Sequence, residues 1–120
     1  MKDHINLGKA GEEIAVKHLT SLGYEILDRN WRWGRQEIDI IARDGNFIVI
    51  TEVKTRQSDF CADPGISVTR GKQRILVNAA NAWVRFKKYN GEVRFDIITI
   101  MIRKDGAEIS HLVDAFYATL

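Results

Sequence analysis

The stretch EIDIIARDGNFIVITEVK, residues 37–54, consists of two apolar runs on either side of Asp44-Gly45. Apolar runs separated by Asp-Gly are a strong short-range signal for a β-hairpin. The stretch therefore predicts strands at about 37–43 and 47–54. Four charged residues interrupt the runs at positions where buried side chains are expected: Glu37, Asp39, Glu52 and Lys54.

The register of this hairpin decides whether the four charges meet, because side chains alternate between the two faces of a strand. A two-residue turn at Asp44-Gly45 places Glu37 opposite Glu52. All four charged side chains then share one face, with Asp39 and Glu52 as diagonal neighbours roughly 7 to 8 Å apart at the backbone. A three-residue turn would instead scatter the four charges over both faces.

Carboxylates that gather without a partner repel one another, and a divalent cation relieves that repulsion. Hard oxygen ligands favour Mg²⁺ or Mn²⁺ over zinc. We therefore interpret Asp39 and Glu52 as metal ligands, and Glu37 as a base or further ligand beside them. Lys54 points to the same side, where an ammonium group can hold a water or stabilise charge on a phosphate. The motif predicts phosphodiester hydrolysis; charges on a solvated sheet face are the alternative.

The flanking sequence predicts the rest of a single domain over residues 1–120. Helices are expected at 7–22 and about 69–88, strands at 24–31, 93–102 and 107–112, and a final helical turn capped by Asp114. Residues 57–68 have no clean period and predict a mobile loop. The order α-β-β-β-α-β-β predicts an α/β fold with a mixed sheet flanked by helices.

The composition is typical of a protein of the reducing cytosol. The single Cys61 cannot form an internal disulfide. The first residues lack the apolar run of a signal peptide, and no apolar segment approaches the length of a membrane span. We expect a cytoplasmic protein without a membrane partner.

Basic residues are clustered, although the formal net charge is only +2. That charge is too small to indicate nucleic-acid binding by itself. Each cluster alone is typical of a solvated face, but together they predict a phosphate-facing rim around the acidic hairpin. The residues expected to contact DNA are Arg32, Arg35, Arg56, Lys72, Gln73 and Arg74.

Other polar and aromatic residues have two interpretations each. Glu12 borders the apolar stripe of the first helix and either joins the acidic site or interacts with the helix dipole. Trp31 and Trp33 alternate with arginines and either stack on bases or belong to the core, which we favour for Trp31. Asp96 has a structural partner or lies near the site. No ligand spacing relates the histidines, so no role is assigned to His4, His18 and His111.

Five segments resemble the YraN-type family of small bacterial proteins: LGKAGEEIAVKHLTSLGYEILDRNWR, EIDIIARDG, EVKTR, RGKQRILVNAA and RFDII. That family is similar to archaeal Holliday junction resolvases and to the PD-(D/E)XK nuclease superfamily. The resemblance implies a restriction-endonuclease-like core, with Asp39 and Glu52 as magnesium ligands and Lys54 as the catalytic lysine. Glu12 matches the helix-one glutamate of the resolvases, and we expect it to complete the metal's ligand shell or to orient it. Because those proteins act as symmetric dimers, the resemblance also implies a homodimer.

We therefore expect a Mg²⁺- or Mn²⁺-dependent endonuclease that acts on DNA, with branched and single-stranded DNA as candidate forms. The alternative is a non-catalytic nucleic-acid-binding or adaptor module that retains the nuclease fold. A third possibility is a structural protein whose acids pair with neighbouring Arg and Lys. The fold by itself does not distinguish these functions.

Overall fold

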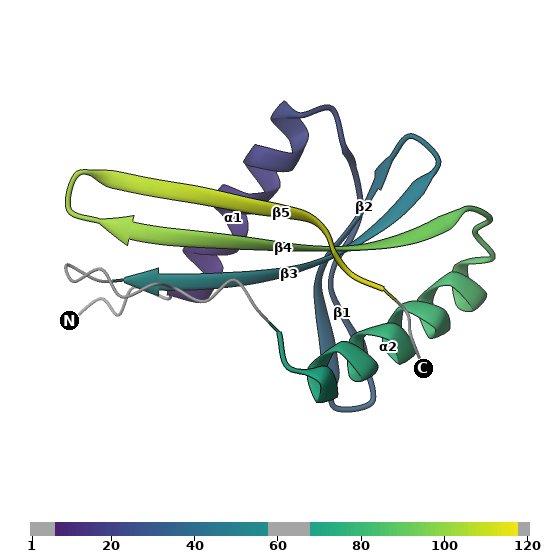
Figure 1. Ribbon diagram of the computed structural model, residues 1–120. Coiled ribbons are helices and arrows are strands. Elements are labelled where there is room, and N and C mark those ends of the chain that lie inside the picture. The colour runs from purple at the N-terminus through teal and green to yellow at the C-terminus, as the bar shows by residue number, and fades with distance from the viewer. Residues whose placement is uncertain (1–6, 58–67, 118–120) are drawn as a thin grey trace, which may run out of the picture.

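The computed structural model describes residues 7–57 and 68–117. The elements are α1 (Leu7–Ser21), β1 (Glu25–Trp33), β2 (Gln36–Asp44), β3 (Phe47–Gln57), α2 (Arg70–Lys87), β4 (Glu92–Arg103) and β5 (Gly106–Phe116). The strands form one sheet in the order β1-β2-β3-β4-β5, in which only β3 and β4 are parallel. Helix α2 makes the crossover between those two strands (Figure 1). The predicted α/β class, mixed sheet and element order are confirmed.

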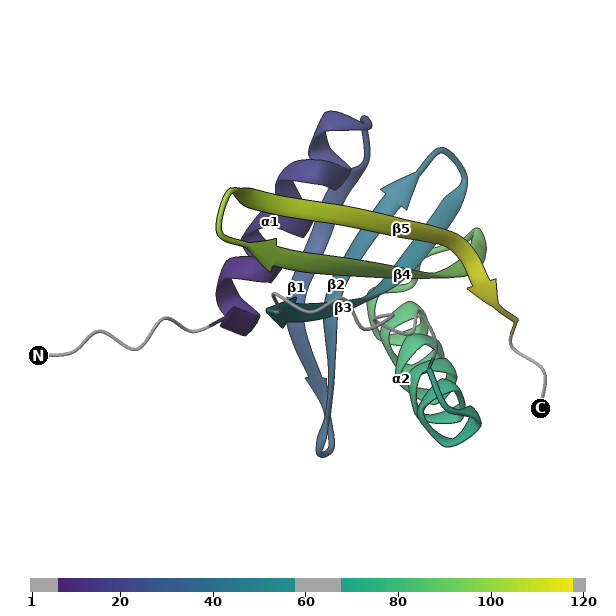
Figure 2. The same cartoon turned by 60° about the vertical axis from the view of Figure 1, so that its left-hand side comes forward.

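The two helices cover opposite faces of the twisted sheet (Figure 2). Ile48 and Ile50 of β3 belong to a core cluster with Leu76 and Trp83 of α2, which we call the α2 cluster. Val49 lies between them and points to the other face. There it joins a second core cluster, which we call the α1 cluster: Ala15, Leu19, Ile40, Ala42, Val49, Ile98 and Ile100. Strand β4 is therefore covered on both faces, as its continuous apolar run predicts.

Local sequence explains where the helices begin and end. The side chain of Thr69 caps α2 by accepting a hydrogen bond from the backbone N–H of Lys72 at 3.2 Å. Lys88 ends the helix in the left-handed region, with a φ of 58°. After α1, Gly23 adopts a φ of 91°, and the N–H of Tyr24 donates back to the carbonyl of Leu19 at 3.0 Å. These ends agree with the predicted helices within two residues.

The turn between β2 and β3 differs from the predicted one. Asp44 pairs with Phe47, so the two turn residues are Gly45 and Asn46. Gly45 adopts a φ of 61°, whereas Asp44 stays in the strand and accepts a hydrogen bond from Arg94 at 2.9 Å. The predicted pairing is therefore wrong by two residues. An even shift leaves every side chain on its predicted face, so the facing of the acids is unaffected.

The C-terminal end of the described chain is a strand and not the predicted helical turn. Strand β5 continues past residue 112 to Phe116. Asp114 does not cap a helix: its φ is 56°, and its N–H donates to the carboxylate of Asp96 at 3.1 Å. The register shift between Phe95 and Ile97 lies at this place, so a bulge lets the edge strand follow the bending sheet.

Two further expectations concern the loop at 57–68 and membrane-spanning segments. Residues 58–67, which make up most of the expected loop and include Cys61, lie outside the described residues, as does His4. Within residues 7–57 and 68–117, neither helix is long and apolar enough to cross a bilayer.

Candidate active site

The candidate site lies where β2 and β3 separate. In the described chain, their pairing ends with Ile40 opposite Thr51. From there β3 continues along β4, while β2 continues along β1 (Figure 1). One carboxylate oxygen of Asp39 accepts the backbone N–H of Val53 at 2.8 Å. The side chain of Asp39 therefore takes the place of a main-chain acceptor, and it is fixed at this fork.

Asp39 is surrounded by other acids. Burial raises the pKa of Asp39 to about 7, against the lowering effect of the Val53 N–H, and repulsion from Glu52, Glu12 and Glu37 raises it further. A carboxyl group with this pKa stays largely protonated below neutral pH, and a nearby positive charge would favour its ionised form. Carboxylates from α1, β2 and β3 therefore act on Asp39 at the fork.

Glu52 faces the start of α2. Burial raises the pKa of Glu52, while the ammonium groups of Lys72 and Lys54 oppose that rise. The Nζ atom of Lys72 lies 3.7 Å from a carboxylate oxygen of Glu52. Glu52 and Lys54 share one face of β3 by strand alternation, the face of the α2 cluster. The structure thus brings the predicted ligand Glu52 and the predicted lysine Lys54 to one side, with Lys72 beside them.

Helix α1 brings Glu12 to the fork through a close contact with β3. A Cβ atom at Gly11 would overlap the Thr55 side chain, so a glycine allows this approach. Glu12 is half-buried, and both of its carboxylate oxygens accept hydrogen bonds from the amide of Asn30, at 3.0 and 3.1 Å. Glu13 is exposed and pairs with Arg29 at 2.8 Å. Glu12 therefore faces inward and Glu13 outward, as the helical pattern indicates.

The other predicted site residues lie on β1, β2, β3 and α2 and in the β1–β2 turn. Glu37 lies opposite Arg32 in the β1–β2 strand pairing, near the turn between these strands, and Arg35 lies in that turn. Arg56 lies near the end of β3 and donates to the carbonyl of Thr55 at 3.2 Å. In α2, Arg74 is exposed, whereas the amide of Gln73 donates to the carbonyl of Val68 at 2.9 Å and thereby fastens the start of the helix.

The set of donors at the fork fits a magnesium or manganese ion held by two protein carboxylates. Within the described residues, no three His, Cys, Asp or Glu side chains are arranged so that they could hold an ion. Mg²⁺ usually keeps several waters and takes only one or two carboxylates from a protein. Asp39 and Glu52 supply such a pair, and the pKa of Asp39 is raised first by burial and then by the neighbouring acids, so an ion there would favour its charged form.

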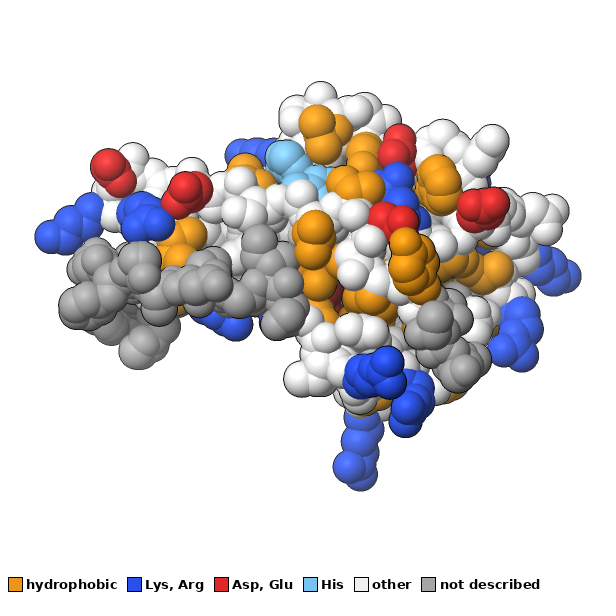
Figure 3. Space-filling model, viewed as in Figure 1, with side chains coloured by type: hydrophobic (Ala, Val, Ile, Leu, Met, Phe, Trp, Pro, Cys, Tyr) orange, Lys and Arg blue, Asp and Glu red, His pale blue; other side chains and the backbone are white. Residues whose placement is uncertain are grey.

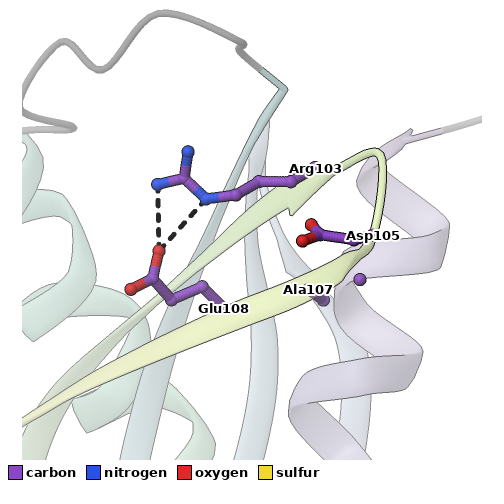
Figure 4. Close-up of a pocket in the computed structure, with 5 residues that line it drawn as sticks. Arg103, Asp105, Ala107 and Glu108 are labelled. Carbon is purple, nitrogen blue, oxygen red and sulfur yellow. Dashed lines mark hydrogen bonds and ion pairs between the residues drawn. The ribbon is translucent and has the colours of Figure 1, made fainter.

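Two hollows on the surface lie away from the fork. One is at the β4–β5 turn, where Arg103 pairs with Glu108 at 2.9 Å beside Asp105 (Figure 4). The other is lined by residues at the β2–β3 turn and before β4: Asn46, Phe47, Gly91 and Glu92. Neither hollow is lined by the acids of the fork or by Lys54.

A buried polar network on the α1 face decides between the two interpretations of Asp96. Asp96 is 1% exposed and accepts two hydrogen bonds from Arg94, at 2.9 and 3.0 Å, and one from His111 at 2.8 Å. Burial acts to raise the pKa of Asp96, but these bonds outweigh it and lower the pKa. Asp96 therefore has structural partners and is not part of the fork.

The same network includes two histidines that the sequence analysis assigned no role. The Nε2 atom of His18 in α1 lies 3.0 Å from the Nδ1 atom of His111 in β5. In the neutral tautomer of His111 that donates from Nε2 to the Asp96 carboxylate, its Nδ1 accepts a hydrogen bond from His18. The two residues are 93 positions apart, so spacing holds no signal of their contact.

The fold and the fork define a small α/β protein with an acidic and lysine-containing site at a strand divergence. The chain belongs to the uncharacterised protein family UPF0102, whose family model matches residues 11–100. It is 44% identical to a UPF0102 protein of Christiangramia forsetii over 98% of each chain, and 43% identical to one of Bacteroides thetaiotaomicron over 100% of this chain and 99% of the relative. A UPF0102 protein of Thermodesulfovibrio yellowstonii is 46% identical over 94% of this chain and 97% of its own. The predicted family is confirmed.

Proposed function

We propose that this protein hydrolyses phosphodiester bonds in DNA with the help of Mg²⁺ or Mn²⁺, and that the reaction takes place at the fork between β2 and β3. The observation that carries the proposal is the state of Asp39. Its carboxylate is fixed by the Val53 N–H, crowded by three other acids and held at a pKa of about 7. Metal-dependent hydrolases place carboxylates in such surroundings because the ion supplies the missing charge.

Each residue of the fork has a role in this proposal. Asp39 and Glu52 would hold the ion, which lowers the pKa of a bound water and neutralises charge on the phosphate. Lys54 orients the attacking water or stabilises the negative charge that develops on the phosphate oxygens. Glu12 and Glu37 would complete the ligand set of the ion or accept hydrogen bonds from nearby water, and Asn30 keeps the Glu12 carboxylate in place.

A basic rim next to the fork would bind the DNA backbone. Figure 3 shows Lys and Arg side chains gathered at the lower end of the view, where the β1–β2 turn and the start of α2 lie in Figure 1. Lys72 pairs with Glu52 in the protein alone, and an ion at Glu52 would free its ammonium group for a phosphate. The residues proposed for this contact are Arg32, Arg35, Arg56, Lys72, Gln73 and Arg74.

We also propose that the protein acts in the cytoplasm and as a homodimer. The single cysteine, which needs no oxidising compartment, supports the cytoplasm. The likeness to the resolvases, whose substrates present two equivalent strands, supports the homodimer.

Metal titration of a matched pair of variants tests the proposed activity. Wild type is expected to cleave DNA with Mg²⁺ or Mn²⁺ and to gain thermal stability from the ion. The double variant Asp39→Ala, Glu52→Ala should lose both effects. The control is Asp105→Ala, Glu108→Ala, which removes the same two charges at the exposed β4–β5 turn and should behave as wild type. Cleavage by the fork variant at the wild-type rate would refute the proposal.

One observation favours a second function, a non-catalytic module that binds nucleic acid. The acids of the fork already have protein partners, since Asn30 binds Glu12 and Lys72 pairs with Glu52. A binding module would show salt-sensitive DNA binding but no turnover with either metal. If metal changes neither stability nor binding, the acids serve only to pair with neighbouring basic residues.

A further inference from the structure

The hairpin arm, residues 31–38, extends beyond the sheet. The β2–β3 pairing described above ends at Ile40, but β1 and β2 continue as a pair until Trp33 lies opposite Gln36. Figure 2 shows this end of β1 and β2 as a narrow two-stranded ribbon that projects past β3. A two-stranded ribbon has little core of its own. Its tip is therefore free to contact a large ligand.

Trp33 at the tip of the arm is the one exposed tryptophan of the three in the chain. Its side chain is 44% exposed. Trp31 packs against the α2 cluster, and Trp83 is 1% exposed and donates its indole N–H to Asp28 at 3.2 Å. The preference for Trp31 as a core residue is thus in keeping with its packing. Trp33 has no such place.

The neighbours of Trp33 are cationic and not apolar. Arg32 precedes it, Gly34 turns the chain with a φ of 64°, and Arg35 follows, and all three are exposed. Protein-binding surfaces place an aromatic anchor in a largely apolar core. An aromatic ring among arginines is typical instead of surfaces that bind single-stranded nucleic acid, where bases stack on rings and phosphates meet cations.

The arm is close enough to act on the DNA that enters the fork. Trp33 pairs with Gln36, which is three residues before Asp39 on β2. At the rise of an extended strand, that distance is roughly 10 Å. A nucleotide bound at the tip is therefore near the phosphate that the fork would hold.

We propose that Trp33 stacks on an unpaired base while Arg32 and Arg35 bind the adjoining phosphates, so that the substrate is single-stranded or branched DNA. In continuous duplex the bases are already stacked on one another, and the indole gains a partner only where a base is free. The inference rests on the proposed function, because it names the substrate class of the same site.

Binding measured without metal tests the arm separately from catalysis. The probes are a fluorescein-labelled oligothymidine, a forked duplex and a blunt duplex, each titrated in EDTA and followed by anisotropy. Trp33→Ala is expected to weaken binding to the first two roughly 10- to 100-fold, as one lost stacked base does. Binding to the blunt duplex should change much less, and Trp33→Phe should recover part of the loss.

Two controls separate stacking from charge and from folding. Phe86→Ala removes another exposed aromatic, at 73% exposure, from the far part of α2 and should leave all three affinities unchanged. Arg32→Ala, Arg35→Ala should weaken all three complexes and reduce the dependence of binding on salt. Because Trp33 is exposed, its variants should keep the wild-type unfolding midpoint.

Three results would overturn the inference. They are an unchanged affinity of Trp33→Ala for oligothymidine, an equal loss for blunt duplex, or a self-association of the wild type that Trp33→Ala abolishes. The last result would assign the indole to a protein interface. Failure of the proposed function looks different: wild type would bind unpaired DNA through Trp33 in EDTA but cleave nothing with Mg²⁺ or Mn²⁺.

Discussion

At the scale of single residues, two aspartates of the sheet lie in opposite electrostatic surroundings. Burial, with added repulsion from the neighbouring acids, raises the pKa of Asp39 to about 7. Asp96 lies among Arg94 and His111, and its pKa falls despite burial. Both are half or fully buried aspartates in neighbouring parts of one sheet. The charges around them distinguish the proposed metal ligand Asp39 from the structural residue Asp96.

Asp39→Asn should change how stability depends on pH. The folded protein binds a proton at Asp39 more tightly than the unfolded chain, whose pKa is near 3.8, so wild type loses stability as pH rises from about 4 to about 7. The difference corresponds to at most about 4 kcal/mol. Asparagine still accepts the Val53 N–H but does not ionise, so the variant should be the more stable protein above pH 7 in urea unfolding.

The control for this comparison is Asp105→Asn, at the exposed β4–β5 turn. It should follow the wild-type pH profile. Parallel stability curves for wild type and Asp39→Asn between pH 4 and pH 7 would show that Asp39 titrates normally.

The titration of His18 should change stability with pH in the opposite direction to that of Asp39. Burial, followed by the neighbouring His111, lowers the pKa of His18 below its ordinary value of 6.5. The unfolded chain then binds the proton more readily, so His18 removes stability as pH falls through 6.5. His18→Gln keeps a donor for His111 and should be less sensitive to acid than wild type. NMR titration of the imidazole gives the pKa, and a value at or above 6.5 would contradict the expectation.

At the scale of elements, the close contact between α1 and β3 sets the distance of Glu12 from the fork. The methyl group introduced by Gly11→Ala would overlap Thr55, and the helix would have to move. We expect a loss of about 1 to 3 kcal/mol in the free energy of unfolding. Reduced metal binding should accompany the loss, since Glu12 moves with the helix. Chemical denaturation and metal titration measure the two effects.

The matched control for that substitution is Gly71→Ala in the first turn of α2. Nothing lies within 4 Å of a Cβ at Gly71. Alanine there should be neutral or stabilise by up to about 1 kcal/mol, because it favours the helix. Equal effects of the two substitutions would mean that the Gly11 contact does not control α1.

How far the sequence predicts this molecule also differs between elements. The alternation around Asp44 and Gly45 was sufficient for the hairpin and for the facing of Asp39 and Glu52. It was insufficient for the register, because the ion pair that keeps Asp44 in the strand comes from Arg94, 50 residues away. The length of β5 was missed for the same reason: Asp114 is held by Asp96 across the sheet. Local patterns fix element type, whereas distant side chains fix ends and register.

At the scale of the whole molecule, a group of basic side chains lies beside the acidic fork. The net charge is only +2, yet basic side chains gather near the β1–β2 turn and the start of α2 (Figure 3), while the acids Glu12, Glu37 and Glu52 act on Asp39 at the fork. This arrangement attracts an anionic polymer to the fork only if a bound cation neutralises the acids there. Metal and DNA are therefore expected to bind as partners, each improving the affinity for the other.

Metal binding and proton binding should compete at the level of global stability. A divalent ion binds the ionised Asp39, whose pKa is about 7, so a proton must leave before the ion can enter. Below pH 6 the same concentration of Mg²⁺ should raise the melting temperature little. At pH 8 the carboxylate is ionised, and an ion at 100 times its dissociation constant should add about 2.7 kcal/mol.

Thermal unfolding of wild type and Asp39→Asn at pH 5.5 and pH 8, each with Mg²⁺ and with EDTA, measures this linkage. Wild type should gain stability from metal mainly at pH 8, and the gain should offset the stability that it loses on ionising Asp39. Asp39→Asn should show a small gain at either pH, because it lacks the charged ligand. A gain of equal size at both pH values in wild type would mean that the ion binds elsewhere, and it would refute the proposed metal site at the fork.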